Sequence, residues 1–96
     1  MLNLKITQAA KVDVLHIIDW YNHRQENFGY KFLEELNLNL KIIQKNPQAF
    51  PVKYPPYHEV ILRHFPCIIT YIVYKKDVII KSVMGAKQHP SKKYRA

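Results

Sequence analysis

The spacing of apolar residues changes several times along the chain, and each change predicts a different secondary structure element. Residues 3–7 alternate between polar and apolar side chains and predict a short strand. From Ala9 the apolar residues recur at three-residue steps, which predicts an amphipathic helix over roughly 8–24 with Thr7 as its N-cap. The predicted apolar stripe of this helix comprises Ala9, Val12, Leu15, Ile18 and Tyr21, with Val14 and Ile17 beside them.

A second helix is predicted over roughly 28–45, after a short break at residues 25–29 that contains a glycine. Asn46-Pro47 ends this helix, because the residue before a proline disfavours the helical conformation. With so short a link, the two helices are predicted to lie antiparallel as a helical hairpin. The apolar stripe of the second helix comprises Phe32, Leu33, Leu36, Leu40 and Ile43.

The second half of the chain reads as three strands joined by short turns. A proline-rich segment at 46–57 comes first and is predicted to be an ordered loop or a poor strand. The predicted strands cover residues 58–64, 67–74 and 78–84, with a turn at 75–77. Gly85 is predicted to end the last strand or to form a bulge in it. Short turns predict an antiparallel meander. The predicted fold class is therefore α+β, in the order β-α-α-β-β-β, with the helical hairpin packed on one face of a twisted, mainly antiparallel sheet.

The strand predicted over 67–74 is apolar on both faces, although a strand with one solvated face should alternate. The helical hairpin covers one face. We expect Ile69, Tyr71 and Val73 to lie on the other face, or the reverse if the register slips by one residue. That second face needs a cover, which the loop at 46–57, the C-terminal tail or another chain can supply.

The composition indicates a single globular domain over residues 1–96, with 48% hydrophobic residues. The one cysteine, Cys67, excludes an intrachain disulfide and suits a reducing cytosol. The N-terminal sequence has no signal-peptide pattern, and no apolar run approaches the roughly 20 residues that span a bilayer. We therefore expect a cytoplasmic protein without a membrane partner.

The charge is strongly positive and unevenly distributed. Of the net +8, residues 1–48 contribute +1, from six Lys/Arg and five Asp/Glu, and residues 49–96 contribute +7, from nine and two. The last ten residues, 87–96, hold four cations and no acid. Such a field attracts polyanions, so we expect a nucleic acid or an acidic protein segment as a partner.

Five short motifs, spread over nearly the whole length, carry a resemblance to a known family. They are Asp19-Trp20-Tyr21, Phe32-Leu33-x-x-Leu36, Lys45-Asn46-Pro47, the run from Leu62 to Pro66 leading into Ile69-x-Tyr71, and the closing run from Ser82 to Tyr94. In this order and spacing the chain resembles the ParE/RelE toxins of type II toxin–antitoxin systems, in particular the ParE-like, plasmid-stabilisation branch.

This resemblance implies a small bacterial toxin encoded beside an antitoxin. The acidic, disordered C-terminal segment of the antitoxin would wrap the toxin and become ordered on binding. The residues expected to contact it are Trp20, Tyr21, Ile69, Tyr71 and Val73. No cofactor is implied. No metal is expected either, because His16 and His23 lack a third ligand at readable spacing.

The chemistry of the RelE-type members is ribosome-dependent cleavage of mRNA, which needs cations and an acid–base group near the 2′-OH. The family positions for an arginine, a histidine and a second arginine fall at Ile68, Gly85 and Gln88, and none of these side chains can do that work. We therefore expect a toxin that is not itself a catalyst and acts on DNA gyrase, as the ParE-like branch implies.

Two alternatives remain at the level of sequence. In the first, the chain is an endoribonuclease that cuts ribosome-bound mRNA and has an altered catalytic site. In the second, it is a non-toxic remnant that only binds its antitoxin or nucleic acid. The candidate catalytic residues of the altered site are Arg63, Lys81, Lys87, His89 and Tyr94.

Overall fold

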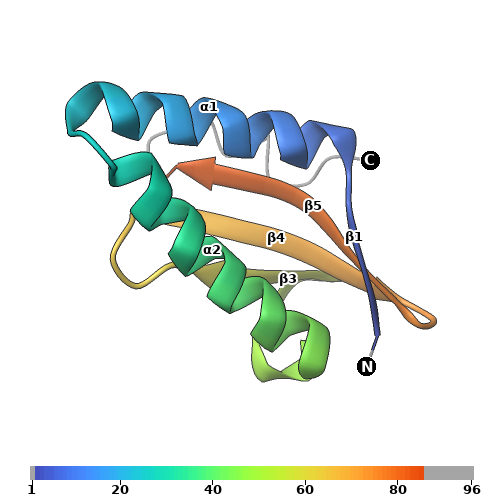
Figure 1. Ribbon diagram of the computed structural model, residues 1–96. Helices are drawn as coiled ribbons and strands as arrows, with labels where there is room; N and C mark the ends of the chain where they lie inside the picture. Colours follow the sequence, from blue (N-terminus) through green and yellow to red (C-terminus); the bar gives the residue numbers. More distant parts are fainter. Residues whose placement is uncertain (1, 86–96) are drawn as a thin grey trace.

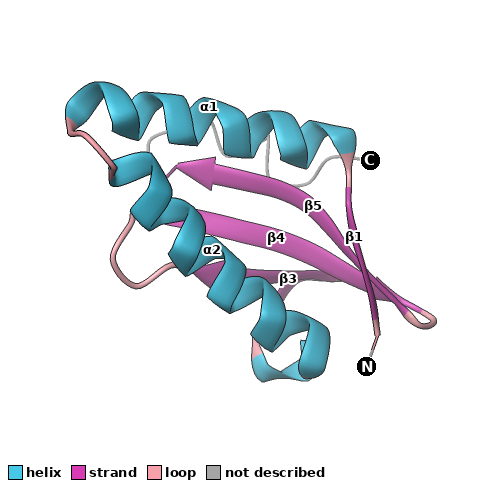
Figure 2. Ribbon diagram, viewed as in Figure 1, coloured by secondary structure: helices cyan, strands magenta, loops and turns pink. Residues whose placement is uncertain are grey.

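A computed structural model describes residues 2–85, in which two helices lie on one face of a five-stranded sheet (Figures 1 and 2). The elements are β1 (Asn3–Ile6), α1 (Gln8–Arg24), α2 (Phe28–Lys45), a 3-10 turn η1 (Pro47–Ala49), β2 (Val52–Tyr54), β3 (Tyr57–Ile61), β4 (Cys67–Tyr74) and β5 (Asp77–Gly85). The predicted class and element order are confirmed. The short strand β2 is an addition within the segment predicted as a loop or poor strand.

The strands lie in the order β1-β5-β4-β3-β2, so the first and last strands along the chain are neighbours. β1 pairs with β5 in parallel, with Leu4 opposite Val78, and the remaining pairs are antiparallel. α1 lies over β5, and α2 runs back across β4 and β3 while diverging from α1 (Figure 1). No helix within residues 2–85 is long and apolar enough to cross a membrane.

The N-terminal end of α1 is as predicted, but only part of its predicted apolar stripe is buried. The Thr7 hydroxyl accepts a hydrogen bond from the Ala10 amide at 3.1 Å, which caps the helix. The buried side chains are those of Ala10, Ile17 and Tyr21, whereas 64% of Leu15 is exposed. A three-residue step falls short of the 3.6 residues per turn, so the predicted stripe drifts around the helix and leaves the sheet.

The apolar stripe of α2 is confirmed, because its spacing follows the helical period. Phe32, Leu36, Leu40 and Ile43 are buried, and Leu33 packs at the edge of the same core. They meet the sheet residues Val60, Leu62, Cys67, Ile69, Tyr71, Val78, Ile80 and Val83 in one cluster. The core therefore lies between the helices and a single face of the sheet.

The proline-rich segment after α2 is ordered because two buried aromatic rings hold its backbone. The Tyr71 hydroxyl donates to the Pro47 carbonyl at 2.6 Å, and His58 Nδ1 donates to the Phe50 carbonyl at 2.9 Å. The two rings are stacked, with centroids 4.7 Å apart. The turn between β2 and β3 contains a cis peptide bond at Pro55-Pro56.

Candidate partner-binding surface

The register of the sheet decides which residues of β4 face the helices. Ile69 lies opposite Val83 and Tyr71 lies opposite Ile80, and all four side chains belong to the core. Ile69 and Tyr71 have no exposed surface, so of the two registers left open by the sequence the structure has the one in which they face the helices and not the second face. Val73 packs partly buried against the same core.

The second face of the sheet is formed by the alternate residues. Glu59, Thr70 and Ser82 form a row across β3, β4 and β5, and all three are buried. Towards the Gly85 end the next row consists of Ile61, Ile68 and Met84, of which Ile61 is 71% exposed. Sequence reasoning placed apolar residues on this face but missed its polar central row.

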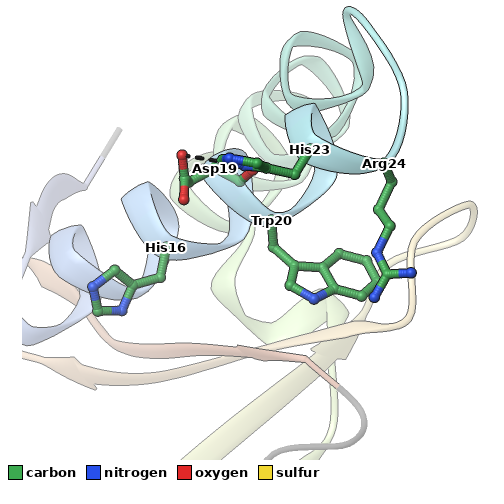
Figure 3. Close-up of a pocket in the computed structure, with 5 residues that line it drawn as sticks. All are labelled: His16, Asp19, Trp20, His23 and Arg24. Carbon is green, nitrogen blue, oxygen red and sulfur yellow. Dashed lines mark hydrogen bonds and ion pairs between the residues drawn. The ribbon is translucent and has the colours of Figure 1, made fainter.

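Of the predicted antitoxin-binding residues, Trp20 is the one that offers a large accessible surface. It is 52% exposed on α1, and the Arg24 guanidinium lies 4.2 Å from the centroid of its ring. Its edge packs on Tyr21, which is itself buried. His16, Trp20 and Arg24 lie on one side of α1 (Figure 3) because they are four residues apart.

Asp19 and His23 form a separate pair on α1, with His23 Nδ1 3.6 Å from the Asp19 carboxylate and 2.7 Å from the Asp19 carbonyl (Figure 3). His16 points away from this pair. Residues 2–85 contain no group of three side chains placed to hold a metal ion. The arrangement around Trp20 therefore suits contact with a partner, since an exposed tryptophan beside an arginine is a typical anchor of a protein interface.

A second exposed feature is a shallow groove between α2 and the loop that joins β3 to β4. Its apolar lining is formed by Phe28, Leu38, Phe65 and Pro66. Beneath it Phe65 packs edge-to-face on Tyr21, with ring centroids 4.9 Å apart. Lys31 extends over Phe28, with its ammonium nitrogen 5.8 Å from the ring centroid. Each of the two exposed features thus combines an aromatic ring with a cation.

The groove keeps its shape because Glu35 of α2 holds the loop. Both carboxylate oxygens accept from the His64 amide, at 3.0 and 3.2 Å, and His64 Nδ1 lies 2.5 Å from one of them. Burial by itself raises the pKa of Glu35, but the hydrogen bonds and charge of His64 outweigh it and lower the pKa. Sequence reasoning missed this pair, since the two residues are 29 positions apart.

Of the candidate catalytic residues, Arg63 and Lys81 lie within the described part of the chain, on segments that are not neighbours in the sheet. Arg63 is exposed beyond the end of β3, whereas Lys81 is part-buried in β5 at an irregularity where Thr70 pairs with Ser82 and Tyr71 with Ile80. β4 lies between β3 and β5, so the backbone segments that carry Arg63 and Lys81 are about 10 Å apart. Lys87, His89 and Tyr94 lie outside the described residues.

Comparison with solved structures identifies the architecture. A chain of the chromosomal ParDE TA system from P. aeruginosa matches with a TM-score of 0.80 and 21% sequence identity, covering 91% of this chain and 98% of that chain. The chain has the ParE/RelE toxin fold. The isolated E. coli RelE toxin matches with a TM-score of 0.68 and 19% identity, covering 95% of this chain and 90% of that chain. No family model and no curated protein sequence matches the chain.

Two of the three altered family positions lie close together in this ParE/RelE fold. Ile68 pairs with Met84, and Gly85 pairs with Cys67, so positions 68 and 85 meet at one end of β4 and β5. Neither side chain can transfer a proton or bind a phosphate. The nearby Cys67 thiol is buried, which raises its pKa to about 11 and keeps it protonated at neutral pH. Gln88, the third position, lies outside the described residues.

Proposed function

We propose that this chain is the toxin of a type II toxin–antitoxin module and is neutralised by a cognate antitoxin. The observation that carries the proposal is the similarity in fold, over nearly the whole chain, to chains from the ParDE system of P. aeruginosa and from the intact E. coli RelBE toxin-antitoxin complex. The latter match has a TM-score of 0.68 and 19% identity, and it covers 92% of this chain and 100% of that chain.

The helix layer provides the contact surface for the antitoxin in this proposal. Trp20 and the groove along α2 expose aromatic and aliphatic area, and Arg24 and Lys31 lie directly beside it. An acidic segment with spaced apolar side chains fits such a surface: its apolar groups bury the rings and its carboxylates pair with the cations. A segment that orders on binding gains this area at an entropic cost, so a few anchors must dominate the affinity.

Co-expression with the product of the neighbouring reading frame tests the antitoxin and the surface together. We expect co-purification of the two proteins, and Trp20→Ala to weaken the complex at least tenfold, as truncation of an interface anchor does. Tyr30→Ala is the matched control, because Tyr30 is 64% exposed on α2 and does not line the groove. Equal affinities of the two variants would exclude Trp20 as an anchor, and failure to co-purify would count against the antitoxin.

We further propose that the toxin acts on DNA gyrase and does not cleave mRNA. Two observations argue against cleavage of mRNA: positions 68 and 85 carry an isoleucine and a glycine, and Arg63 follows β3 whereas Lys81 lies in β5, on the far side of β4. DNA gyrase is the target that the resemblance to the ParE-like branch implies. Cleavage at a 2′-OH needs a base and a cation within hydrogen-bond reach of the same phosphate. Ile68 and Gly85 supply neither group, and β4 lies between the segments that carry Arg63 and Lys81.

Induction of the chain alone in a sensitive bacterium separates the targets. Inhibition of gyrase should induce the DNA-damage response while translation continues, whereas an mRNA endonuclease should stop translation within minutes and leave cut messages. Rapid cleavage of mRNA on programmed ribosomes by the purified protein would refute the proposed target. Harmless accumulation of soluble, folded protein would instead identify a non-toxic remnant.

A further inference from the structure

The net charge of the described residues is confined to the sheet layer. Residues 8–46, which form the two helices and their link, hold five cations and five anions, a net of zero. The remaining described residues, 2–7 and 47–85, hold six cations and two anions, a net of +4. A polyanion that approaches the chain is therefore attracted to the sheet more than to the helices.

Most of this excess lies at one end of the sheet. The turn between β2 and β3 and the turn between β4 and β5 lie at the same end, because β3 and β4 are antiparallel. Lys53 stands in β2, Lys75 and Lys76 form the β4–β5 turn, and Lys5 lies on β1 opposite Ile79. The acid at this end, Asp77, is compensated by Lys5 at 3.3 Å and by the Asn3 amide at 3.2 Å.

Exposed tyrosines share this end with the lysines. Tyr54 is the partner of Tyr57 on β2. His58 is opposite Tyr71 on the core side of the sheet, so the preceding residue, Tyr57, lies on the second face beside Ile72. Tyr74 is two residues further along β4 and points to the same face. Tyr54 is 61% exposed and Tyr74 is 59% exposed, so their rings offer large accessible surfaces. Their positions two strands apart put them on the order of 10 Å from each other.

We infer that this end of the sheet, with Tyr54, Tyr57 and Tyr74 on the second face and the four lysines at the same end, binds single-stranded nucleic acid. Aromatic rings accept the flat faces of unpaired bases whatever their sequence, and the surrounding ammonium groups neutralise phosphates. Exposed rings beside lysines match this ligand better than an acidic peptide, because a base stacks on the face of a tyrosine ring and a carboxylate does not. The site lies at the opposite end of β4 and β5 from positions 68 and 85, and its existence does not depend on the proposed toxin function.

Fluorescence anisotropy of the purified full chain with a labelled oligouridylate, and in parallel with a labelled oligothymidylate, tests the inference. We expect binding that weakens with salt and a loss of about tenfold or more in affinity on Tyr74→Leu. Lys75→Gln combined with Lys76→Gln should reduce the slope of log affinity against log salt by about 1.4, from two phosphate contacts on a single strand. Binding of either oligonucleotide that weakens on Tyr74→Leu supports the site, and a preference between them distinguishes an RNA from a DNA ligand.

Tyr30→Leu is the matched control, since it removes a similarly exposed tyrosine from the neutral helix layer and should leave the affinity unchanged. Thermal unfolding of each variant checks that the fold is intact. Absence of binding to both oligonucleotides, or equal losses for Tyr74→Leu and Tyr30→Leu, would overturn the inference. So would displacement of the oligonucleotide by polyglutamate together with an unchanged affinity of the Tyr74→Leu variant, because the surface would then recognise only negative charge.

Discussion

Glu35 illustrates a residue whose role depends on a segment distant in sequence. On α2 it occupies a helical position between the buried stripe and the exposed side, where a glutamate is ordinarily solvated. The β3–β4 loop brings the amide and imidazole of His64 against its carboxylate, so that only 13% of the side chain is exposed. A charge that is nearly buried must be compensated by such donors, and the loop therefore depends on this one side chain.

Glu35→Gln should lower the free energy of unfolding by about 2 kcal/mol at neutral pH, because hydrogen bonds to a charged acceptor are lost. The pKa of Glu35 is lowered in the folded chain from its ordinary value of 4.5. Its stabilising contribution is therefore complete above that value and is lost as the pH falls through the lowered pKa. Urea unfolding of the chain and of the variant, at neutral and at acidic pH, should show the difference shrinking in acid.

Glu34→Gln provides the control, since Glu34 is exposed on the same turn of α2. Its effect should stay within about 0.5 kcal/mol at both pH values. Similar losses for the two variants would show that the general charge of α2, and not the contact with His64, accounts for the effect.

Tyr71→Phe isolates one hydrogen bond between the sheet and the proline-rich segment. The Tyr71 hydroxyl is buried, which raises its pKa to about 12, so it stays protonated and donates to Pro47 at any ordinary pH. Removing it should cost about 1 kcal/mol and leave the Pro47 carbonyl without this donor. Hydrogen exchange should accelerate within residues 47–51 and stay unchanged in α1; uniform acceleration would contradict this local role.

At the scale of elements, α1 shows that an apolar stripe in the sequence does not by itself identify the buried side of a helix. Its exposed side carries Val12 and Leu15, which the sequence assigned to the apolar stripe, together with Trp20, while Asp13 faces the sheet. The Asp13 carboxylate accepts from the Val83 amide at 3.1 Å, close to the irregularity in β5. The helix therefore buries a polar contact and exposes apolar area, which leaves that area accessible to a partner.

Ile17→Ala and Leu15→Ala, two aliphatic truncations on the same helix, should separate these faces. Ile17 is 8% exposed, so its truncation should destabilise the chain by about 2–4 kcal/mol through a cavity. Leu15 is 64% exposed, so the same change should stay within about 0.5 kcal/mol. Denaturant unfolding measures both, and a large loss for Leu15→Ala would mean that the orientation of α1 is different.

At the scale of the whole molecule, the fold places the net positive charge of the described residues on one of its two layers. The helix layer is electrically neutral and exposes Trp20 and the groove, whereas the sheet layer carries the net +4 of the described residues. The gradient of charge along the sequence becomes a difference between the two layers of the structure. One partner can therefore bind the helices through apolar anchors while another is attracted to the sheet.

Retention on a cation-exchange column should reveal this asymmetry. Lys75→Gln with Lys76→Gln removes two cations from the sheet end, and Lys41→Gln with Lys45→Gln removes two from α2, so both variants have the same net charge. The first variant should elute at a lower salt concentration than the second, because clustered charges contribute more to binding a polyanionic surface than dispersed ones. Identical elution would show that only the total charge matters.

The elements, their order and the α2 stripe could be predicted because they depend on local periods and on the residues that end helices. The burial of Ile69 and Tyr71 could not, since a strand that is apolar on both faces fits either register. The Glu35–His64 contact and the convergence of tyrosines and lysines were equally hidden. Both depend on which distant segments become neighbours, and no local pattern encodes that.

The sequence by itself determined the β-α-α-β-β-β order, the capping of α1 by Thr7 and the excess of positive charge. Propensity and periodicity depend on residues close together in the sequence, and net charge depends only on the total composition. Only the tertiary structure decided which face of β4 is covered, that β1 lies in parallel beside β5, and that the net positive charge of the described residues lies on one layer. Those outcomes depend on packing and strand pairing between residues tens of positions apart, and these contacts form only when the chain folds.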